Sequence, residues 1–260
     1  MTCKICTSES QLLFSKKILG KYDSGFYKCT NCGFMQTDKP TWLAEAYQDA
    51  ISDMDTGILE RNIKFGKIVP IIIKSYFDAK SKFIDFGAGY GIFVRMMRDK
   101  GFDFWWQDAH CQNLFARKFD SKFTSEQKFE LLTAFEVFEH LEDPLSEVEQ
   151  MLKYSDNILF STNLVPKNYQ LTTDNYQLKD WWYLSPETGQ HIAFYTEKSL
   201  QILGEKYGLN LYTNGHNFHL FTRKKMNPYI FTGLKILKNI QNMIKTAYNG
   251  AQNDRDTYKK

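Results

Sequence analysis

Residues 82–91 read Lys82-Phe83-Ile84-Asp85-Phe86-Gly87-Ala88-Gly89-Tyr90-Gly91. They predict a short buried strand, an acid, a turn with glycines at alternate positions, and then a helix. The predicted helix ends at Gly101, since glycine commonly terminates helices. A strand, a glycine turn and a helix in this order open an α/β domain of the nucleotide-binding type. The amides at the N-terminus of such a helix suit an anionic ligand group.

The spacing of the glycines indicates which ligand this turn binds. The dinucleotide fingerprint is G-x-G-x-x-G, and Ile92 occupies the position of its third glycine. The pattern D-x-G-x-G-x-G instead resembles the first motif of the class I S-adenosylmethionine (SAM) dependent methyltransferases. The resemblance implies that this motif receives the methionine half of SAM, and its candidate cofactor residues are Asp85, Gly87, Ala88, Gly89 and Gly91.

A second acid fits the same cofactor. Residues 101–108 predict the next strand, and it ends at Asp108, whose carboxylate is placed to accept hydrogen bonds from two ribose hydroxyls. The resemblance adds Ala134, Phe135 and Glu136, which follow the fourth strand, to the cofactor contacts. A glycine turn in some other α/β enzyme is the alternative interpretation.

Composition limits the remaining classes. The chain has 260 residues, 43% of them hydrophobic, enough for one full domain and a small appendage. It lacks both a run of 18 apolar residues and a signal-peptide segment, so we expect a cytoplasmic protein without a transmembrane segment. The net charge of +3, with acids and bases interspersed, argues against a dedicated nucleic-acid binder.

Four of the five cysteines form two C-x2-C pairs near the N-terminus: Cys3, Cys6, Cys29 and Cys32. Two such pairs offer four thiolates to one tetrahedral Zn²⁺, and four thiolates leave no open position for catalysis. We therefore predict a structural zinc ribbon, with free thiols at accidental spacing as the alternative. Cys111 lies outside the pattern and is predicted to be an ordinary buried thiol.

Strand and helix patterns alternate after the ribbon. We expect helices at residues 41–51 and 58–79, the second interrupted at Pro70, a weakly marked strand near residues 121–124, and strands at 129–136 and 157–162. Asp143 and Pro144 predict the start of another helix. Asn214-Gly215 predicts a terminal antiparallel hairpin. The expected fold is α/β, a doubly wound Rossmann-like sheet of the class I methyltransferase type with this hairpin at its end.

This pattern predicts three domains along the chain. Residues 1–40 form the zinc-binding ribbon, and residues 41–225 form the methyltransferase domain, with a lid at 163–195. Residues 226–260 form a basic helical extension. We expect that helix to pack on the domain or in a homodimer interface, and the alternative is contact with a membrane surface.

The motifs taken together point to a narrower group. The CxxC pairs, D-F-G-A-G-Y-G, A-F-E-V-F-E-H-L-E-D-P and G-Q-H-I-A-F-Y-T resemble bacterial methyltransferases of deoxysugar and surface-polysaccharide biosynthesis that carry a zinc-binding N-terminal domain. The resemblance covers roughly residues 3–223. It implies SAM and Zn²⁺ as cofactors. It also implies a small-molecule acceptor, such as a nucleotide-linked sugar or a capsule precursor, and no nucleic acid.

Two histidines are the candidate catalytic bases. His191 and His140 are both expected at the carboxyl ends of strands, where ligands bind in such sheets, and histidine suits proton transfer near neutral pH. In the resembling C-methyltransferases a glutamate precedes the histidine that corresponds to His191, whereas this chain has Gln190 at that position. The loss of that carboxylate favours a hydroxyl as the acceptor over carbon, so we expect O-methylation with His191 as general base.

Aromatic and charged residues complete the candidate substrate set: Tyr47, Arg61, Trp181, Trp182 and Tyr183. The three aromatics of 181–183 could stack on a sugar or nucleotide, face the sulfonium, or simply form core. Tyr47 and Arg61 could close over the cofactor or lie in surface turns. Two other functions stay open, an rRNA methyltransferase that grips RNA through its zinc module, and a non-catalytic zinc-ribbon scaffold.

Overall fold

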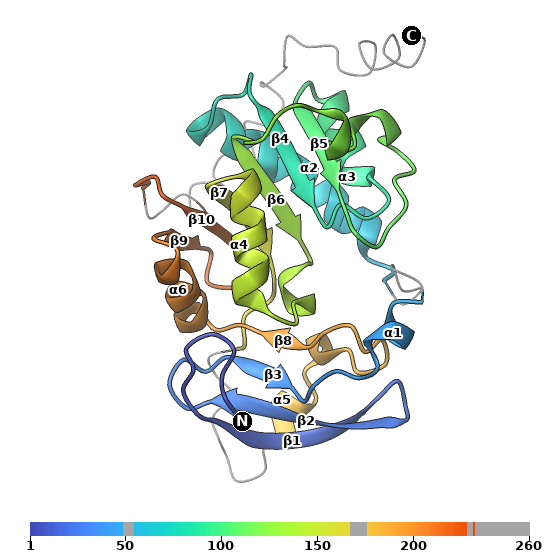
Figure 1. The fold of residues 1–260 in the computed structure, drawn as a ribbon, viewed down its shortest axis with the longest axis vertical. Coiled ribbons are helices and arrows are strands. Elements are labelled where there is room, and N and C mark those ends of the chain that lie inside the picture. The colour runs from blue at the N-terminus through green and yellow to red at the C-terminus, as the bar shows by residue number, and fades with distance from the viewer. Residues whose placement is uncertain (49–54, 167–175, 228–230, 232–260) are drawn as a thin grey trace. The chain divides into compact units, whose positions relative to one another are not determined.

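The computed structural model describes residues 1–48, 55–166, 176–227 and 231 (Figure 1). The chain packs into two compact units that interleave along the sequence. Unit 1 comprises residues 1–54, 136–150 and 160–223, and unit 2 comprises residues 55–135, 151–159 and 224–260. None of the described helices is long and apolar enough to cross a bilayer.

A mixed six-stranded sheet is the main β-structure, and its strand order is β5-β4-β6-β7-β10-β9. The parallel strands of unit 2 are β4 (Lys82–Phe86), β5 (Asp103–Gln107) and β6 (Leu131–Phe135). In register, Asp85 lies opposite Trp106 on one side and Thr133 on the other. The strand β7 is Asn157–Ser161. The predicted terminal hairpin is confirmed, because β9 (Asn210–Thr213) and β10 (Phe218–Thr222) pair antiparallel.

Six α-helices lie in the described part of the chain, and five of them lie outside the segment predicted to be a lid. Unit 2 contains α2 (Ile58–Tyr76) and α3 (Ile92–Asp99), and α4 (Pro144–Tyr154) and α6 (Glu197–Lys206) follow later in the chain. The side chain of Asp143 accepts hydrogen bonds from the first amides of α4, as expected of an N-cap. Gly101 has a φ of +87° just after α3, which confirms the predicted helix end. The fifth, α1 (Leu43–Ala46), is a single turn, and residues 49–51 of the helix expected there lie outside the described part.

Two expected elements are wrong. The helix α2 runs through Pro70 without a break. Proline removes one backbone hydrogen bond at a cost of about 3 kcal/mol, but burial of four side chains around it (Val69, Ile71, Ile72 and Ile73) outweighs that loss at about 1.5–3 kcal/mol each. The weak strand expected near residues 121–124 is a 3-10 helix, Ser121–Phe123, preceded by another at Arg117–Phe119. Just before this 3-10 helix, Asp120 forms an isolated parallel β-bridge with Trp106 of β5.

A second sheet lies in unit 1 and has the order β1-β2-β3-β8. It consists of β1 (Ser10–Ile18), β2 (Tyr22–Cys29), β3 (Met35–Thr37) and β8 (Ala193–Phe194), all paired antiparallel (Figure 1). Its last strand comes from the segment predicted to be a lid. That segment also contains α5 (Tyr176–Lys179) and the 3-10 turn Trp182–Leu184. Another 3-10 turn, Phe138–His140, also belongs to unit 1. Residues 167–175 of the predicted lid lie outside the described part.

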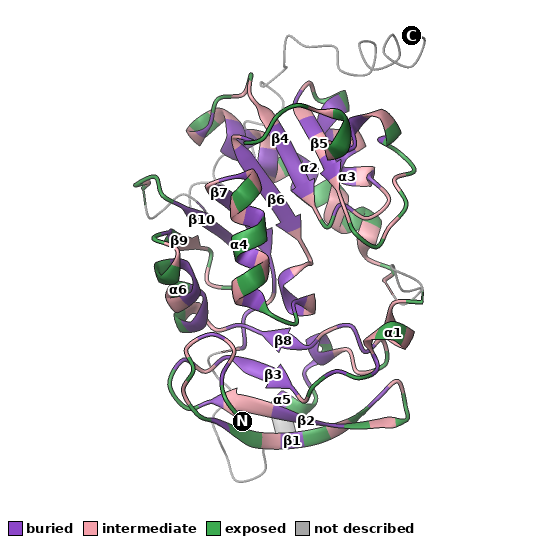
Figure 2. Cartoon of the chain, viewed as in Figure 1, coloured by how far each residue is buried: buried purple, intermediate pink, exposed green. Residues whose placement is uncertain are grey.

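Each unit has its own apolar interior. In Figure 2 the strands β4, β6 and β7 are almost wholly buried, as continuous apolar runs in parallel sheets should be. In unit 1 a cluster of buried side chains joins the second sheet to the 181–194 segment, and it includes Phe26, Trp42, Trp181, Tyr183 and Phe194. The predicted helix at 226–260 lies outside the described residues apart from a few positions, and the three-domain division stays a prediction.

Candidate active site and cysteine cluster

The glycine turn of unit 2 has the backbone geometry that its sequence requires. Gly87, Gly89 and Gly91 all have positive φ, at +67°, +53° and +86°. A Cβ on Gly91 would also lie 3.0 Å from Asn113 Oδ1. A side chain at this position would therefore be both strained and crowded. The turn is a backbone cradle at the N-terminus of α3, a place in the fold that suits an anionic ligand group.

Asp108 follows β5 and is tied to the glycine turn. Its Oδ2 accepts a hydrogen bond from the Gly89 amide at 2.9 Å, and its Oδ1 accepts from the amides of His110 and Cys111 at 2.7 and 2.8 Å. The indole of Trp106 donates to the Gly89 carbonyl at 2.8 Å, so both backbone polar groups of this residue are held. A carboxylate has about four acceptor positions, so Asp108 keeps capacity for a ribose hydroxyl while it shapes the turn. Cys111 is half-buried, and burial raises its thiol pKa to about 11.

Asp85 lies inside the sheet. Only 4% of it is exposed, and the Thr133 hydroxyl of the neighbouring strand donates to its carboxylate at 2.5 Å. Burial raises the pKa of Asp85 to about 7, with a smaller contribution from the charge of Asp108, although the Thr133 hydrogen bond favours the charged form. Of the other cofactor candidates in unit 2, Ala134 is fully buried and the Phe135 ring stacks on Phe65 at 4.1 Å between centroids.

We expect Asp85→Asn to remove a pH dependence of stability. The unfolded carboxyl titrates near its ordinary value of about 4, so between that pH and about 7 the folded state holds a proton that the unfolded state has lost. Stability of the wild type should fall with rising pH in this window, by up to about 1.4 kcal/mol per pH unit. Denaturant unfolding of wild type and variant at about pH 5 and about pH 8 measures the difference. Equal pH dependence of the two proteins would contradict this assignment, and Asp156→Asn, at a half-exposed position, is the matched control.

In unit 1 both candidate histidines lie in one group of side chains. Their rings are perpendicular, with 5.0 Å between the centroids of His140 and His191. His140 Nδ1 lies 2.9 Å from the Tyr47 hydroxyl. Burial raises the pKa of Tyr47 well above its ordinary value, so its hydroxyl stays protonated at neutral pH. The structure therefore brings together three of the residues predicted from the sequence.

The tautomer of His191 follows from its partner. Its Nδ1 lies 2.6 Å from the backbone carbonyl of Tyr183, and because a carbonyl can only accept, Nδ1 carries the proton and donates. In the neutral ring Nε2 then presents a lone pair, the arrangement that a general base needs. Gln190, the neighbour that replaces a glutamate, donates through its amide to the Ala46 carbonyl at 2.8 Å and is nearly buried.

A glutamate that the sequence reasoning missed belongs to the same group. Glu139 has no exposed surface, and its Oε1 accepts a hydrogen bond from the Tyr183 hydroxyl at 2.6 Å. Its Oε2 has no hydrogen-bond partner among the described residues. Burial raises the pKa of Glu139 to about 8, and the charge of Glu136 adds to the shift. The motif A-F-E-V-F-E-H contains this residue directly before His140, but nothing in the pattern distinguishes an inward-facing glutamate from an exposed one.

Glu136, the last of the cofactor candidates, follows β6. It has a φ of +54°, a conformation rare for a side chain of this size. Ser161 holds it there from both ends, because its hydroxyl accepts from the Glu136 amide at 2.9 Å and donates to Oε1 at 2.5 Å. Strain of this kind is common at functional sites.

The remaining substrate candidates separate by burial. Trp181 and Tyr183 are core side chains of unit 1, 8% and 1% exposed, whereas Trp182 is 75% exposed and available for stacking. One guanidinium nitrogen of Arg61, in unit 2, donates to both carboxylate oxygens of Asp55 at 2.5–2.6 Å. Of the histidines not proposed for catalysis, His110 and His216 are exposed, and burial lowers the pKa of His219 to about 4.

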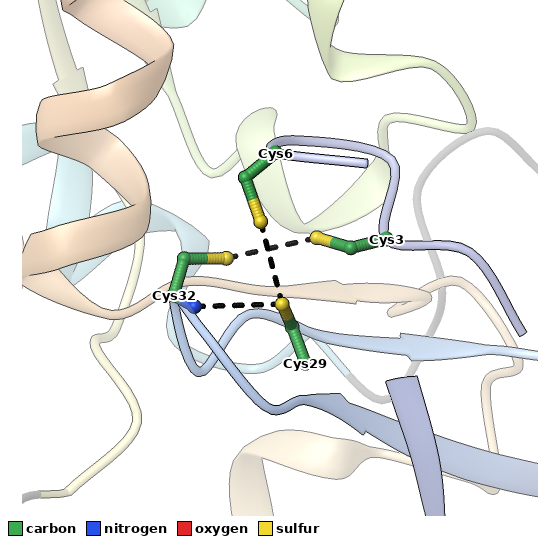
Figure 3. Close-up of side chains that lie close together, drawn as sticks. All are labelled: Cys3, Cys6, Cys29 and Cys32. Carbon is green, nitrogen blue, oxygen red and sulfur yellow. Dashed lines mark hydrogen bonds between the residues drawn. The ribbon is translucent and has the colours of Figure 1, made fainter. Parts of the chain in front are cut away.

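The four N-terminal cysteines converge in unit 1, as Figure 3 shows. The Sγ atoms of Cys3 and Cys32 are 3.6 Å apart, and those of Cys6 and Cys29 are 3.4 Å apart. Tetrahedral zinc with Zn–S bonds of 2.3 Å places its sulfurs about 3.8 Å apart, so the cluster has nearly the dimensions of a zinc site. Backbone amides of Asn31 and Cys32 point at the Cys29 sulfur at 3.4 Å, which stabilises a thiolate there.

The cysteine cluster is joined to α6 within unit 1. The Thr196 hydroxyl, which also caps α6, donates to the Cys32 carbonyl at 2.6 Å, and Lys198 donates to the Asn31 carbonyl at 2.8 Å. The second C-x2-C pair, Cys29 and Cys32, is therefore held by a segment more than 160 residues further along the chain.

The fold and the glycine turn define an α/β protein of the nucleotide-binding type. A family model described as a methyltransferase domain matches residues 62–214, and the chain belongs to that family. It has the Rossmann-like methyltransferase fold and is a SAM-dependent methyltransferase. Among curated proteins no match was found.

Solved structures give more distant matches. They include CalO1, a methyltransferase in calicheamicin biosynthesis in its SAH-bound form (13% identity, 70% of this chain and 61% of that chain, TM-score 0.44). The PH0226 protein from Pyrococcus horikoshii matches at 13% identity over 72% of this chain and all of its own, with a TM-score of 0.42. The mitomycin 7-O-methyltransferase MmcR matches at 12% identity over 71% of this chain and 61% of its own, with a TM-score of 0.45. At these values the matches carry no argument about the substrate.

Proposed function

We propose that this methyltransferase transfers the methyl group of SAM to a hydroxyl of a nucleotide-linked sugar or another surface-glycan precursor. The observation that carries the proposal is His191, whose Nδ1 proton is committed to a backbone carbonyl and whose Nε2 can accept a proton. Gln190 beside it is engaged with the Ala46 carbonyl, so the neighbouring position offers no second base. An imidazole base suits a hydroxyl, whose proton is far more acidic than one on carbon.

When bound, SAM would supply a methyl group carried on its sulfonium sulfur, and S-adenosylhomocysteine would leave when the methyl group passes to the acceptor oxygen. The glycine turn and Asp108 hold the cofactor through its carboxylate and ribose. His191 Nε2 takes the proton of the acceptor hydroxyl as the new O–C bond forms, which balances the transfer. His140, oriented by Tyr47, is the second group able to contact the acceptor. Trp182 is the one aromatic of residues 181–183 with a face available for a sugar or base.

We propose further that the cysteine cluster binds a structural Zn²⁺. Four thiols at near-ligand separations and amides directed at one sulfur support this, and the set leaves no open coordination position. The cytoplasmic location and the homodimer interface stay predictions, as does the exclusion of nucleic acid. Retention of RNA with a steep salt dependence would favour an rRNA methyltransferase instead.

Replacement of His191 by asparagine tests the base. We expect turnover to fall about 10²–10⁴-fold, the usual contribution of a general base, while S-adenosylhomocysteine still binds. The assay screens nucleotide sugars for release of S-adenosylhomocysteine. His216→Asn, at an exposed position, is the matched control and should retain full turnover. Near-normal turnover in His191→Asn would remove this histidine from the mechanism.

A further inference from the structure

Glu139 is an unexplained feature of the candidate acceptor site. It is fully buried, yet one of its carboxyl oxygens, Oε2, has no hydrogen-bond partner among the described residues. A buried polar atom without a partner costs free energy, so it persists in folded proteins mainly where it serves a function. Its other oxygen is held by the Tyr183 hydroxyl, and its backbone carbonyl accepts from the Ile192 amide at 2.9 Å. The side chain is therefore fixed in place, and its idle oxygen is not a result of disorder.

The candidate partners of this carboxyl group are the two histidines. One side-chain oxygen of Glu139 and one ring nitrogen from each of His140 and His191 all lie within 4.8 Å of one another. The backbone bond from Ile192 to Glu139 joins the two motifs next to these histidines. A carboxylate at this separation from an imidazole favours the protonated ring.

We propose that Glu139 is a positioning residue for catalysis: its carboxylate stabilises the imidazolium that forms when the histidine pair accepts the proton of the acceptor. It supplies, from the motif before His140, the negative charge that Gln190 does not provide. The inference rests on the proposed function, and it adds a role that the sequence assigned to no residue. The proton itself moves only from the acceptor oxygen to a histidine nitrogen, and Glu139 holds the opposing charge.

The surroundings of Glu139 are consistent with this role. The ionisable groups around it are Glu136, Tyr183, Tyr195, Tyr47 and the two histidines. None of these is a lysine or arginine, so the charged carboxylate has no permanent cation to pair with in the described part of the chain, and burial favours its neutral form. An imidazolium would be its natural counter-ion. The glutamate and the histidines should consequently titrate as one coupled group.

Titration of the histidines tests the inference without knowledge of the acceptor. Protein labelled with ¹⁵N-histidine gives ring signals for all five histidines, and His191→Asn and His140→Asn variants assign the two of interest. In Glu139→Gln, which retains an oxygen to accept from Tyr183, we expect the titration midpoint of His191 or His140 to move to lower pH by about one unit. Glu149→Gln removes an exposed carboxylate ten positions further on and should leave both midpoints in place.

The outcomes separate this inference from the proposed function. S-adenosylhomocysteine binding is measured on the same samples, and loss of binding in the wild type would overturn the methyltransferase assignment itself. Normal binding with unmoved midpoints in Glu139→Gln would overturn the role of Glu139 alone. If that variant does not fold, the wild type still decides, because a carboxylate partner requires at least one of the two midpoints to lie above that of exposed His216. Both midpoints below it would overturn the inference.

Discussion

Replacement of Cys32 by serine is expected to abolish zinc binding and to unfold the N-terminal part of unit 1. Binding of structural zinc contributes about 10–16 kcal/mol in small zinc domains, which is as large as the total stability of many domains. The sheet β1-β2-β3-β8 has few buried side chains beyond those of one cluster, so it cannot replace such a contribution. The effect should extend to α6, which Thr196 and Lys198 join to this C-x2-C pair.

Metal analysis and thermal unfolding measure this effect. Wild-type protein should contain one zinc per chain, and Cys32→Ser should lose it along with a cooperative transition. Cys111→Ser is the matched control, since that thiol lies outside the cluster and should leave both properties unchanged. A full zinc complement in Cys32→Ser, or a wild type that folds equally well after chelation, would show that the cluster is only four neighbouring thiols.

Replacement of Asp108 by alanine is expected to weaken S-adenosylhomocysteine binding by at least about 100-fold. The change removes a charged acceptor for the ribose, and hydrogen bonds to charged groups contribute about 1.5–3 kcal/mol each. It also removes the acceptor of three backbone amides, one in the glycine turn and two in the loop after β5. Both effects act on the cofactor, one directly and one through the conformation of the turn.

Calorimetry with S-adenosylhomocysteine measures the loss, and NAD serves as the control ligand for the wild type. Asp99→Ala is the matched variant, because this acid on α3 makes a surface ion pair with Arg95 and the protein should bind the ligand normally without it. Equal affinities of Asp108→Ala and the wild type would place the ribose elsewhere. Tight binding of NAD by the wild type would contradict the cofactor assignment.

Much of the region around the glycine turn could be predicted because its sequence signals are local. The strand β4, the turn at Gly87–Gly91 and the helix α3 follow one another within a few residues, and each is fixed by its own sequence. The same holds for the Asn214-Gly215 hairpin and the cap at Asp143. Where the local signal was weak, near residue 121, or where packing outweighed it, at Pro70, the prediction was wrong.

The group of side chains around the two histidines could be predicted only in part. The histidines were identifiable by residue type, but Glu139 was not, because only its burial and its Tyr183 partner give it significance. The triplet at 181–183 looked uniform in sequence, yet two of its members face the core and one faces solvent. The pairing of β8 with β3 likewise depends on a contact between segments more than 150 residues apart, which no short pattern encodes.

The glycine turn, the cysteine pairs and the class of enzyme could thus be predicted without a structure, since each depends on residues at short fixed spacings whose backbone conformation is set locally. Tertiary structure decided which polar side chains are buried together. It placed Tyr47, Glu139, His140, Tyr183 and His191 in one group, from three separate parts of the chain. The physical reason is that burial and mutual distance set the proton affinity of such groups, and both are properties of the folded chain.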